Sequence, residues 1–520
     1  MAKDKALGPD AFPPNFFQAN WDLVGDDIVK MVQHFFLSGH ILKEMNSTFI
    51  SQIPKIESPT SLSHFRPISL CNTTYKIISK LLDQRMKPFP NKIISPYQSA
   101  FIPGRQISDN IVIAHELIHS MRSKRGVKGD KGSMGIKIDM VKDFDRNLSR
   151  TLIHSEDLGI ISGIKICKGA PSINHLLFAD DCMVFCKANK IEAQNLMDIL
   201  NLFGDTSGQL IDFNKSGVFF SRNTDPSLIP AISNIMGVKV LQLDDKYLGS
   251  PLFTHLSKIK SFRPRVDKMK LRLSSWKNVP LNPAGREILI KTVTPKTSIF
   301  QMNCFRIPKQ TFQDLNKLQR YFFWGKNLEN PTGYYPKAWT AIYKPKELSG
   351  LGFINMELFN RSMIIEIGWR LEQDKDSLWY QLMDSKYLMG GNILNMDTKA
   401  KYGNSWIWKG ILQGIQNIQQ YCSWKIGKGN RIKIWEDLWI PNSTEKLIKP
   451  AHCLQHIEML KHLMTPSGKW NAQLVQQIFS INTAQIILSQ EIHPGADDTM
   501  SWNLNNTGKF SVKATQDKDR

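Results

Sequence analysis

The sequence predicts an α+β fold that is divided into several domains. Apolar residues recur at helical spacing near the N-terminus, short alternating strand patterns follow between residues 133 and 221, and helical patterns return towards the C-terminus. The chain is 520 residues long, which gives it room for roughly three or four domains with an ample core.

The N-terminal region is expected to be rich in helix. A first set of apolar residues recurs at steps of three or four, and Gly39 follows it as a stop signal. Residues 75–86 and 108–121 show the same periodicity, so three helices are expected before the first strand patterns. The first set consists of Phe17, Trp21, Val24, Ile28, Met31 and Phe35.

Two adjacent aspartates, Asp180 and Asp181, lie between two apolar runs in the middle of the chain. Residues 175–179 and 182–185 are each the length of a strand, so the acidic pair falls where a turn must join them. Neighbouring carboxylates repel each other, and a bound divalent cation is a natural way to hold them together. The alternative is a plain Asp-Asp turn, because aspartate is a common turn residue. The pattern predicts a hairpin with a candidate metal site at its tip.

A third carboxylate is expected close to this hairpin. Residues 135–139 read as a short alternating strand that ends on Asp139. Carboxylates on rigid strands can hold two Mg²⁺ ions, which activate an attacking hydroxyl and stabilise the leaving oxygen in phosphoryl transfer. Asp139 together with Asp180 and Asp181 therefore predicts a site for this chemistry.

The charge balance indicates a polyanionic partner. The chain has 67 Lys and Arg residues against 46 Asp and Glu residues, a formal net charge of +21. Phosphate backbones are the commonest partner of such a surface, although a merely basic soluble protein would show the same balance. Cations are concentrated between residues 258 and 277, where Asp267 is the one acid. This segment predicts a helix face that binds phosphates, or a solvated basic face. Its cations are Lys258, Lys260, Arg263, Arg265, Lys268, Lys270, Arg272 and Lys277.

The cysteines and the hydropathy pattern exclude several classes of protein. Seven cysteines are scattered without a Cys-x-x-Cys pair, so we expect neither a disulfide framework nor a zinc site. Cys182 and Cys186 lie at strand spacing in and beside the predicted hairpin and are expected in the core instead of as metal ligands. No apolar run has membrane-spanning length, and no signal-peptide pattern begins the chain. We therefore expect a soluble intracellular protein, nuclear or cytoplasmic, without a membrane partner.

The region after residue 330 is rich in tryptophan. Its patterns are helical, and one further hairpin is expected between residues 422–426 and 431–435 across a glycine-containing turn. Indole rings can stack on nucleic-acid bases, but packing in the core is the default for tryptophans at strand or helix spacing. The tryptophans are Trp339, Trp369, Trp379, Trp406, Trp408, Trp424, Trp435, Trp439, Trp470 and Trp502.

The motifs around the aspartates resemble those of reverse transcriptases, most closely the polymerases of plant LINE-type (non-LTR) retrotransposons. The two central matches are residues 137–146, KIDMVKDFDR, and residues 175–181, HLLFADD. Further segments are similar to the family's motifs and occur in the same order, so the resemblance covers nearly the whole chain. These segments are residues 5–10, 65–70, 98–105, 207–216 and 247–252.

The resemblance implies a right-hand polymerase of the α+β class, built from fingers, palm and thumb. The fingers would be residues 1–132, the palm residues 133–221 and the thumb residues 222–330. Residues 331–520 would form a tryptophan-rich connection that leads into a truncated zinc-binding segment. Residues 508–513 resemble the start of that segment. The chain ends before any Cys/His cluster, so we expect no zinc.

The resemblance also assigns roles to single residues. Asp139 and Asp180 would be the ligands of two Mg²⁺ ions, and Asp181 would complete the cluster of charge. Lys215 lies where the family has a lysine that can protonate the leaving pyrophosphate. The cations of residues 258–272 would bind the backbone of the template–primer duplex.

Three further residues would contact the incoming deoxynucleotide. Phe144 falls at the family's steric-gate position, where an aromatic ring excludes a ribose 2′-hydroxyl. Arg66 and Arg105 would approach the triphosphate, because guanidinium suits paired contacts with phosphate. For both arginines and for Lys215, an ordinary surface cation is the alternative. The partners implied are an RNA template, a DNA primer and deoxynucleotides.

The sequence departs from the family between the two halves of the expected site. Only 41 positions separate Asp139 from Asp180, far fewer than the family has. Arg146 is followed directly by residues that resemble the end of a later helix, and the loop that forms the floor of the nucleotide pocket has no counterpart. Asp143 adds a negative charge where the family has a small residue. We therefore expect a palm helix too short to cover its sheet, and a copy that is inactive as a polymerase.

Three functions are compatible with this sequence. The first is a reverse transcriptase that uses two Mg²⁺ ions. The second is a non-catalytic nucleic-acid-binding remnant of a retrotransposon, whose basic thumb still binds duplex. The third is a structural protein built on an inactive polymerase core. Because Met1 lies almost at the first fingers motif, we expect the endonuclease that precedes the polymerase in the family to be absent.

Overall fold

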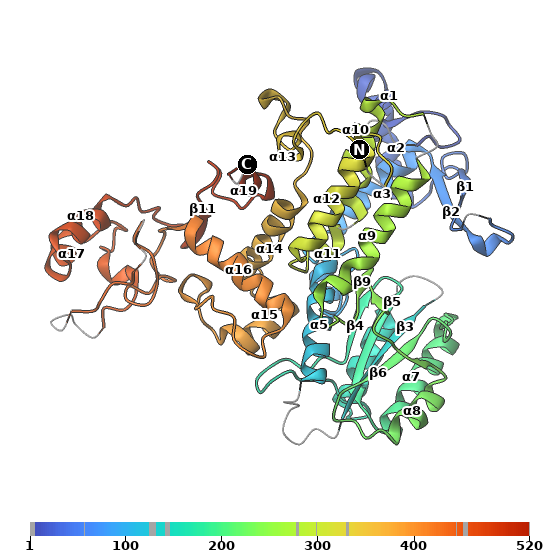
Figure 1. Ribbon diagram of the computed structural model, residues 1–520, viewed down its shortest axis with the longest axis horizontal. Coiled ribbons are helices and arrows are strands. Elements are labelled where there is room, and N and C mark those ends of the chain that lie inside the picture. The colour runs from blue at the N-terminus through green and yellow to red at the C-terminus, as the bar shows by residue number, and fades with distance from the viewer. Residues whose placement is uncertain are drawn as a thin grey trace. The chain divides into compact units, whose positions relative to one another are not determined.

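The computed structural model forms two compact units, Met1–Ile94 and Ser95–Arg520 (Figure 1), and each is described by itself. No helix among the described residues is long and apolar enough to span a membrane. The structure describes residues 6–56, 58–123, 132–140, 146–276, 280–297, 299–328, 332–441, 443, 445–450 and 456–518.

The first unit consists of helices and one antiparallel pair of strands. The helices expected over residues 17–35 and 75–86 are confirmed, the first as α1 and α2 with a break at Asn20. α2 ends at Gly39, whose φ of 70° is the left-handed conformation that glycine adopts without strain. The elements are α1 (Pro14–Ala19), α2 (Trp21–Ser38), β1 (Thr48–Pro54), β2 (Phe65–Cys71), α3 (Thr73–Met86) and α4 (Pro90–Ile93).

The second unit is built around a five-stranded sheet in the order β4-β5-β3-β6-β7. All neighbours in this sheet are antiparallel except β6 and β7, which are parallel. The strand expected before Asp139 and the hairpin around Asp180 and Asp181 are confirmed. The helix expected over residues 108–121 is α5 (Ile107–Arg122). The strands are β3 (Ser133–Asp139), β4 (His175–Phe178), β5 (Asp181–Lys187), β6 (Gly217–Phe220) and β7 (Lys239–Val240).

Side chains of the sheet alternate between two cores. On β5, Cys182, Val184 and Cys186 point to one face, where they are buried with side chains of three helices. Met183 and Phe185 point to the other face and join the larger core, which includes α5. This is the period-two alternation of a strand that is covered on both faces, and it confirms that the two cysteines are core residues. The three helices are α6 (Arg146–Asp157), α7 (Lys190–Ser207) and α8 (Leu228–Met236).

α6 covers its part of the sheet despite its shortness. Leu148 and Leu152 are 0% exposed and belong to the core beneath the sheet. The expectation that a shortened helix exposes the apolar face of the palm is therefore wrong for these residues, because α6 is amphipathic and packs against both α7 and β4. Leu158 and Ile160, just past the end of α6, are exposed.

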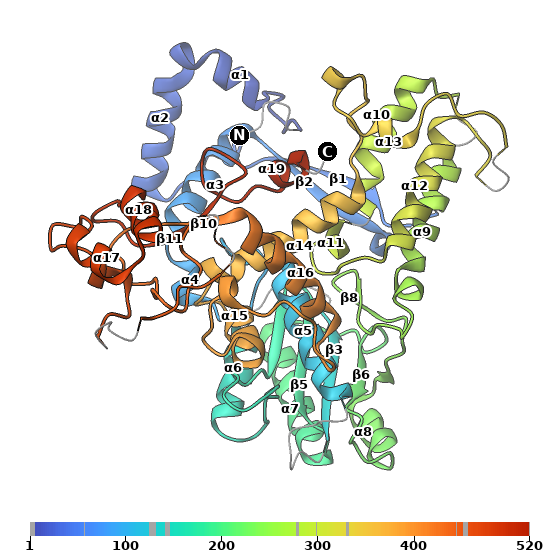
Figure 2. The ribbon, with the colours of Figure 1, turned by 60° about the vertical axis from the view of Figure 1, so that its left-hand side comes forward.

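The remainder of the second unit is mainly helical. α9 packs along α12, and α14 crosses α16 (Figure 1, Figure 2). A Cβ atom on Gly414 would lie 2.7 Å from the carbonyl oxygen of Ile364, so glycine permits the close approach of α14 and α16. The longer elements are α9 (Lys258–Ser275), α10 (Pro283–Val293), α12 (Lys309–Phe323), α14 (Met356–Gln373) and α16 (Trp406–Tyr421). The shorter ones are β8 (Lys246–Tyr247), β9 (Ser250–Pro251), α11 (Ile299–Met302), α13 (Trp339–Ile342), α15 (Leu378–Met383), β10 (Cys422–Lys425), α17 (Ala472–Ile478), α18 (Ile481–Ser489), β11 (Thr499–Trp502) and α19 (Val512–Lys518).

The hairpin expected between residues 422–426 and 431–435 is wrong. β10 pairs instead with β11, which lies far along the chain. The residues of the expected turn wrap around the buried carboxylate of Asp498, which accepts from the N–H groups of Gly427 and Gly429 at 2.8 and 2.9 Å. These bonds satisfy the backbone donors that a hairpin turn would have used otherwise.

The tryptophans of the C-terminal region pack mainly in the core, as the default interpretation of their spacing predicts. Trp379, Trp408 and Trp502 are at most 2% exposed. Trp408 stacks on Tyr387 with 4.2 Å between ring centroids. These three rings thus form the hydrophobic centre of this region.

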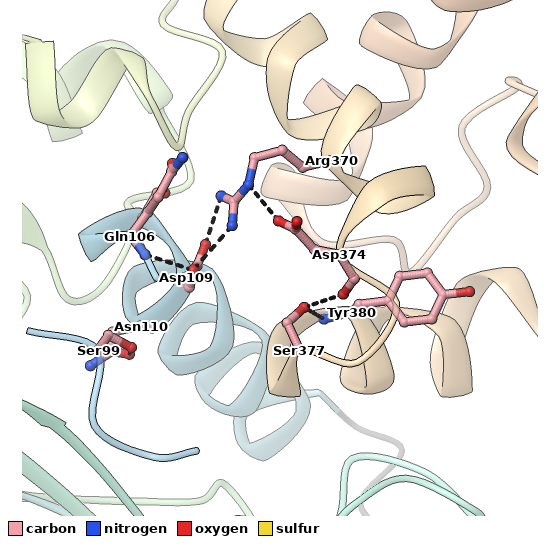
Figure 3. Close-up of polar contacts among 9 residues, drawn as sticks. Ser99, Gln106, Asp109, Asn110, Arg370, Asp374, Ser377 and Tyr380 are labelled. Atoms are coloured by element: carbon pink, nitrogen blue, oxygen red, sulfur yellow. Dashed lines mark hydrogen bonds and ion pairs between the residues drawn. The ribbon is translucent and has the colours of Figure 1, made fainter. Parts of the chain in front are cut away.

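A buried ion pair connects α5 with α14, two helices of the second unit that lie far apart in the sequence (Figure 3). Arg370 donates to both carboxylate oxygens of Asp109, at 2.8 and 3.2 Å, and to Asp374 at 2.8 Å. Asp109 also accepts from the N–H of Gln106, which caps the start of α5. Buried charges of this kind are stable only when they are paired, so α5 and α14 must fold together.

A second buried polar cluster surrounds Glu116, which lies on α5 beyond Asp109 towards the C-terminal end of the helix. Glu116 is 0% exposed and accepts from Lys386 and from the hydroxyl of Tyr387, both at 2.8 Å. The hydroxyl of Ser405 also donates to Glu116. α5 is therefore held to the tryptophan-rich part of the chain at two points along its length.

Candidate metal and nucleic-acid site

The hairpin brings three aspartates to one end of the sheet. The register of β3 and β5 places Asp139 directly opposite Asp181, and Asp180 lies in the turn between β4 and β5. Cβ atoms of such opposite residues are about 4.5–5.5 Å apart on the same face. Ala179 has a φ of 53°, a left-handed conformation that is uncommon for residues other than glycine. Strained backbone of this kind is concentrated at functional sites.

The three carboxylates influence one another electrostatically. Burial raises the pKa of Asp181, and the charges of Asp180 and Asp139 raise it further. Lys137, whose ammonium lies 4.0 Å from the Asp181 carboxylate, acts in the opposite direction. A divalent cation at this position would relieve the repulsion between the carboxylates.

These residues fit a magnesium ion that is shared with a phosphate ligand. The parts of the chain that the structure describes contain no group of three or more His, Cys, Asp or Glu side chains that could hold a metal ion by themselves. Magnesium is commonly bound by one or two carboxylates together with substrate phosphates and water. Asp139 and Asp180, the two expected ligands, meet this smaller requirement, and Asp181 opposite Asp139 adds to the negative charge.

Replacing Asp181 with asparagine is expected to stabilise the protein by about 1 kcal/mol at neutral pH. The folded-state pKa of Asp181 is raised, so its ionised form is disfavoured in the folded protein, and removing the charge removes this cost. The gain should disappear as the pH falls through the folded-state pKa, where the wild-type carboxyl takes up its proton. Thermal melting at several pH values measures the difference.

The effect of magnesium on the melting temperature tests whether Asp181 helps to bind a cation. The ion binds the folded carboxylates and not the unfolded chain, so it should raise the melting temperature of the wild type more than that of Asp181→Asn. Asp205→Asn, an exposed change on α7, is the control and should follow the wild type in both experiments. An equal response of all three proteins to magnesium would count against a cation site at the hairpin.

Lys215 lies close to the carboxylates because the loop before β6 is tied to the end of β3. The N–H of Asp212 donates to the carbonyl of Asp139 at 2.9 Å, and the N–H of Asp139 donates to the hydroxyl of Ser216 at 3.2 Å. Lys215 forms an ion pair with Asp212 at 2.8 Å. Its hydrogen bond with Asp212 raises the pKa of Lys215, and the charge of Asp139 raises it further, so the lysine stays protonated beside the site.

The residues expected to contact the nucleotide lie in different parts of the structure. Arg66 is exposed on β2 of the first unit. Arg105 belongs to the second unit, where its Nη1 donates to two backbone carbonyls within residues 95–98, both at 2.5 Å. Phe144 lies outside the described residues. The structure thus brings together the three aspartates and Lys215, and the nucleotide contacts stay predictions.

Two cations of the basic segment form hydrogen bonds that stabilise the fold of the second unit. The expected basic segment forms α9, and Lys258 at its first position donates to the hydroxyl of Thr254 at 2.9 Å. Arg265 donates to the carbonyl of Gly249 in the turn between β8 and β9, and so fixes that turn to the helix. Burial lowers the pKa of both side chains.

Other cations of α9 face solvent and one another. Arg263 pairs with Asp267 at 3.3 Å, with both side chains more than half exposed. Burial lowers the pKa of Lys268, and the neighbouring charges of Arg265 and Arg272 lower it further, as crowded like charges do. Phosphates bound along this helix would relieve that crowding. Besides the residues named, the cations of α9 are Lys260 and Lys270.

Two histidines, one buried and one half-buried, make the stability of the second unit depend on pH. Burial lowers the pKa of His175, at the start of β4, to about 3, and that of His115, on α5, to about 4. Both must be neutral in the folded protein, whereas the unfolded chain protonates them near pH 6.5. Stability should therefore fall as the pH drops below 6.5, by up to about 1.4 kcal/mol per pH unit for each histidine.

Urea unfolding between pH 8 and pH 4 measures this loss. His175→Gln should lower the free energy of unfolding at pH 8, because it disturbs the hydrogen bond of 2.8 Å with the Ser149 hydroxyl. The same change should make the free energy of unfolding depend less on pH. His40→Gln, a change at an exposed position of the first unit, should leave the pH dependence as it is. A steeper loss in His175→Gln than in the wild type would show that this histidine is not the origin of the effect.

Four cavities of about 390 to 960 Å³ are lined by described residues of the second unit. None of the four has Asp139, Asp180 or Asp181 in its lining. Sequence reasoning missed one residue of the carboxylate site, Lys137. Its position two residues before Asp139 on an alternating strand puts both side chains on one face, and this signal could have identified it.

Comparison with known proteins finds a family match in one segment of the chain. Residues 53–156 match the family described as reverse transcriptase (RNA-dependent DNA polymerase). A putative ribonuclease H protein of Arabidopsis thaliana is 28% identical over 265 residues, which cover 49% of this chain and 42% of that protein. An uncharacterized 149 kDa protein of transposon TX1 from Xenopus laevis is 32% identical over 146 residues, which cover 28% of this chain and 11% of that protein.

A third relative is much shorter. An uncharacterized mitochondrial protein of Arabidopsis thaliana is 26% identical over 147 residues, which cover 28% of this chain and 94% of that protein. The chain therefore matches nearly the whole of one short relative but less than half the length of the first two.

Proposed function

We propose that this protein, a reverse transcriptase of LINE-type retrotransposon origin, binds nucleic acid and divalent cations but does not extend a primer. The family match and the transposon relative confirm the resemblance on which the family assignment rests, and the Arabidopsis relatives fit a plant origin. In this proposal the fingers are residues 1–132, the palm residues 133–221, the thumb residues 222–330 and the tryptophan-rich connection residues 331–520. The mixed helical and stranded fold is compatible with that division.

The observation that carries the proposal is the short connection between the two halves of the carboxylate site. β3 ends at Asp139, α6 begins at Arg146, and β4 begins at His175. α6 is a single helix of 12 residues, and the family match stops at residue 156, before the hairpin. Phosphoryl transfer depends mainly on positioning and on charge stabilisation. A palm that lacks the loop under the nucleotide would keep the charge of its carboxylates but would not position the incoming nucleotide.

The carboxylate site would supply the chemistry of an intact polymerase. Asp139 and Asp180 would hold magnesium, which activates the primer hydroxyl and stabilises the leaving oxygen when bound. Lys215, protonated beside Asp139, would give a proton to the leaving pyrophosphate. Phe144 would exclude ribonucleotides, and Arg66 and Arg105 would bind the triphosphate, as the family resemblance implies.

Nucleic-acid binding is proposed for the exposed cations of α9. Lys268 and Arg272 are crowded by like charge, and a duplex backbone would offset this repulsion. The partners proposed are an RNA template and a DNA primer, which the family relation implies. Contacts of this kind give affinity without sequence preference.

Replacing Lys268 and Arg272 together with glutamine is expected to weaken duplex binding and to flatten its salt dependence. Each phosphate contact contributes about −0.9 to the slope of log K against log salt concentration, so the double variant should lose about 2 from the magnitude of the slope. Fluorescence anisotropy of a labelled RNA–DNA duplex over a series of KCl concentrations measures the slope.

A charge-matched control separates local contacts from net charge. Lys399→Gln with Lys401→Gln removes the same charge from an exposed loop that contributes to neither α9 nor the sheet. This pair should leave the slope as it is. If both double variants lose the same amount, the duplex is bound by diffuse charge and α9 has no special part in it.

A catalytically active polymerase is the second candidate function. The hairpin favours it, because Asp139 and Asp181 are in register and Ala179 has the strained backbone typical of a functional turn. The two candidates differ in one result, the extension of a primer that the protein binds.

A further inference from the structure

We propose that the largest of these four cavities binds a phosphate-bearing nucleotide of a single-stranded nucleic acid, at a site separate from the palm carboxylates. The cavity has a volume of about 960 Å³, within the range of ligand sites. It is lined by the C-terminal half of α5, the end of β6, the segment that leads into α9, and the start of α16. The inference concerns binding alone and holds whether or not the carboxylate site is catalytic.

The register of the sheet separates this cavity from the carboxylates. Phe220, which lines the cavity, lies opposite Met134 on β3. Met134 is five residues from Asp139 along the same strand, a distance of about 16 Å at the rise of a β-strand. The N–H of Arg222, another lining residue, donates to the carbonyl of Met121 at the C-terminal end of α5. The cavity therefore lies at the opposite end of the sheet from the hairpin.

The lining of the cavity is cationic. It contains Arg122, Arg222 and Lys260, and it contains no Asp or Glu. All three side chains are exposed, and none of them has an ion-pair partner within the described ranges. Exposed cations that converge on one cavity without acids attract an anion, and guanidinium groups suit phosphate in particular.

A second layer of charge lies just behind the lining. Burial lowers the pKa of Lys258, and the charges of Lys409 and Arg122 lower it further, so these cations lie within electrostatic reach of one another. The nearest buried acid, Glu116, is already bonded to Lys386 and two hydroxyl groups. One exposed acid, Asp244, lies 3.7 Å from Nε2 of the lining residue His255. Because the cations outnumber this acid, the charge around the cavity is positive.

Two helix N-termini add to this positive potential. α9, of 18 residues, follows Ser257, and α16, of 16 residues, follows Ser405. Both of these N-cap residues line the cavity. The N-terminal end of a helix carries a partial positive charge and favours phosphate.

Aromatic side chains favour a nucleotide over an acidic peptide. Phe220 and Trp406 line the cavity beside the cations. Phe305, which is 1% exposed, packs against Trp406 with 5.5 Å between the ring centroids. Trp406 is half-buried, and the ammonium of Lys258 lies 5.1 Å from the centroid of one of its rings. Bases of a single strand are bound by such aromatic and cationic surfaces, whereas the bases of a duplex are stacked on each other and inaccessible.

The test compares single-stranded with duplex binding in one pair of variants. Arg122→Gln with Arg222→Gln should weaken binding of a short labelled oligothymidylate by about tenfold or more at physiological salt. The affinity for an RNA–DNA duplex should change much less, because α9 is proposed to bind it. Lys399→Gln with Lys401→Gln, which removes equal charge elsewhere, should change neither affinity. Arg222→Gln alone, at a lining residue outside α9, serves as the second cavity variant if the arginine pair does not keep the wild-type melting temperature.

Competitors identify the source of the phosphate. Displacement by an unlabelled single strand and not by free deoxythymidine triphosphate supports a polynucleotide, and displacement by the triphosphate supports a free nucleotide at the same site. Displacement by polyglutamate at equal charge would overturn the proposal in favour of a general polyanion or acidic-protein site.

Cross-linking adds a readout that is local to the cavity. An oligonucleotide with 4-thiouridine should cross-link under light to peptides that contain Phe220 or Trp406. Cross-links confined to α9, or equal losses in the cavity variants and the charge-matched control, would overturn the proposal. Loss of duplex binding in the α9 variants is independent of both results, so failure here is distinguishable from failure of the proposed function.

Discussion

Arg370→Ala is expected to destabilise the second unit by about 3 to 5 kcal/mol, since removal of one member of a buried ion pair leaves the other uncompensated. The side chain of Arg370 is 11% exposed and that of Asp109 is 10% exposed. Truncation leaves the Asp109 carboxylate buried at the start of α5, together with Asp374, which loses its bond to the Arg370 guanidinium. Urea unfolding followed by tryptophan fluorescence measures the loss, because several tryptophans are buried in the same unit.

An exposed pair of the same chemistry is the matched control. Arg263 and Asp267 on α9 lie 3.3 Å apart, but their side chains are 62% and 54% exposed. Arg263→Ala should therefore cost less than about 1 kcal/mol. Adding Asp109→Asn to Arg370→Ala should recover part of the loss, because the uncompensated charge is removed. Equal losses from Arg370→Ala and Arg263→Ala would refute the view that α5 and α14 are held together by this pair.

Restoring the palm between Arg146 and Asn147 is expected to raise primer extension by at least about 10³-fold, since a well-oriented reacting pair gains this much or more. The inserted segment would be the corresponding strand and loop of an active reverse transcriptase of the same family. The repaired chain would have both the carboxylates at Asp139 and Asp180 and a floor that positions the nucleotide. Extension of a labelled primer on an RNA template, with magnesium and deoxynucleotides, measures the gain.

Asp180→Ala in the repaired chain is the control. Its extension should fall back to background, because the carboxylate that would hold magnesium at the turn is lost. A repaired chain that remains inactive while it binds the duplex as the wild type does would show that the short palm connection is not the cause of inactivity.

Local patterns in the sequence predicted the elements that build the carboxylate site. The alternation before Asp139 and the apolar runs around Asp180 and Asp181 carry the strand period, and the structure has β3, β4 and β5 in those places. Helix stops were equally visible, as at Gly39. These features depend on neighbouring residues alone, and such patterns are the part of a fold that a single sequence contains most directly.

Features that depend on distant partners were not predictable in this way. Residues 422–426 look like one arm of a hairpin, yet β10 pairs with β11 because the Asp498 carboxylate takes the N–H groups of the expected turn. The buried acids of α5 were missed as well. Asp109 and Glu116 lie in a helix that is buried nearly all round, and acids in such a helix indicate partner cations elsewhere in the chain. Which cations they are, Arg370 and Lys386, follows only from the three-dimensional structure.

The central claim is that the protein binds a primer–template duplex and does not extend it. The most direct test measures both on one sample: anisotropy gives the affinity of the wild-type chain for a labelled RNA–DNA duplex, and addition of magnesium and deoxynucleotides to the same bound complex gives the extension. We expect salt-dependent binding, with no more product than Asp180→Ala makes. Extended primer from the wild-type chain that Asp180→Ala does not make would contradict the claim and establish an active polymerase.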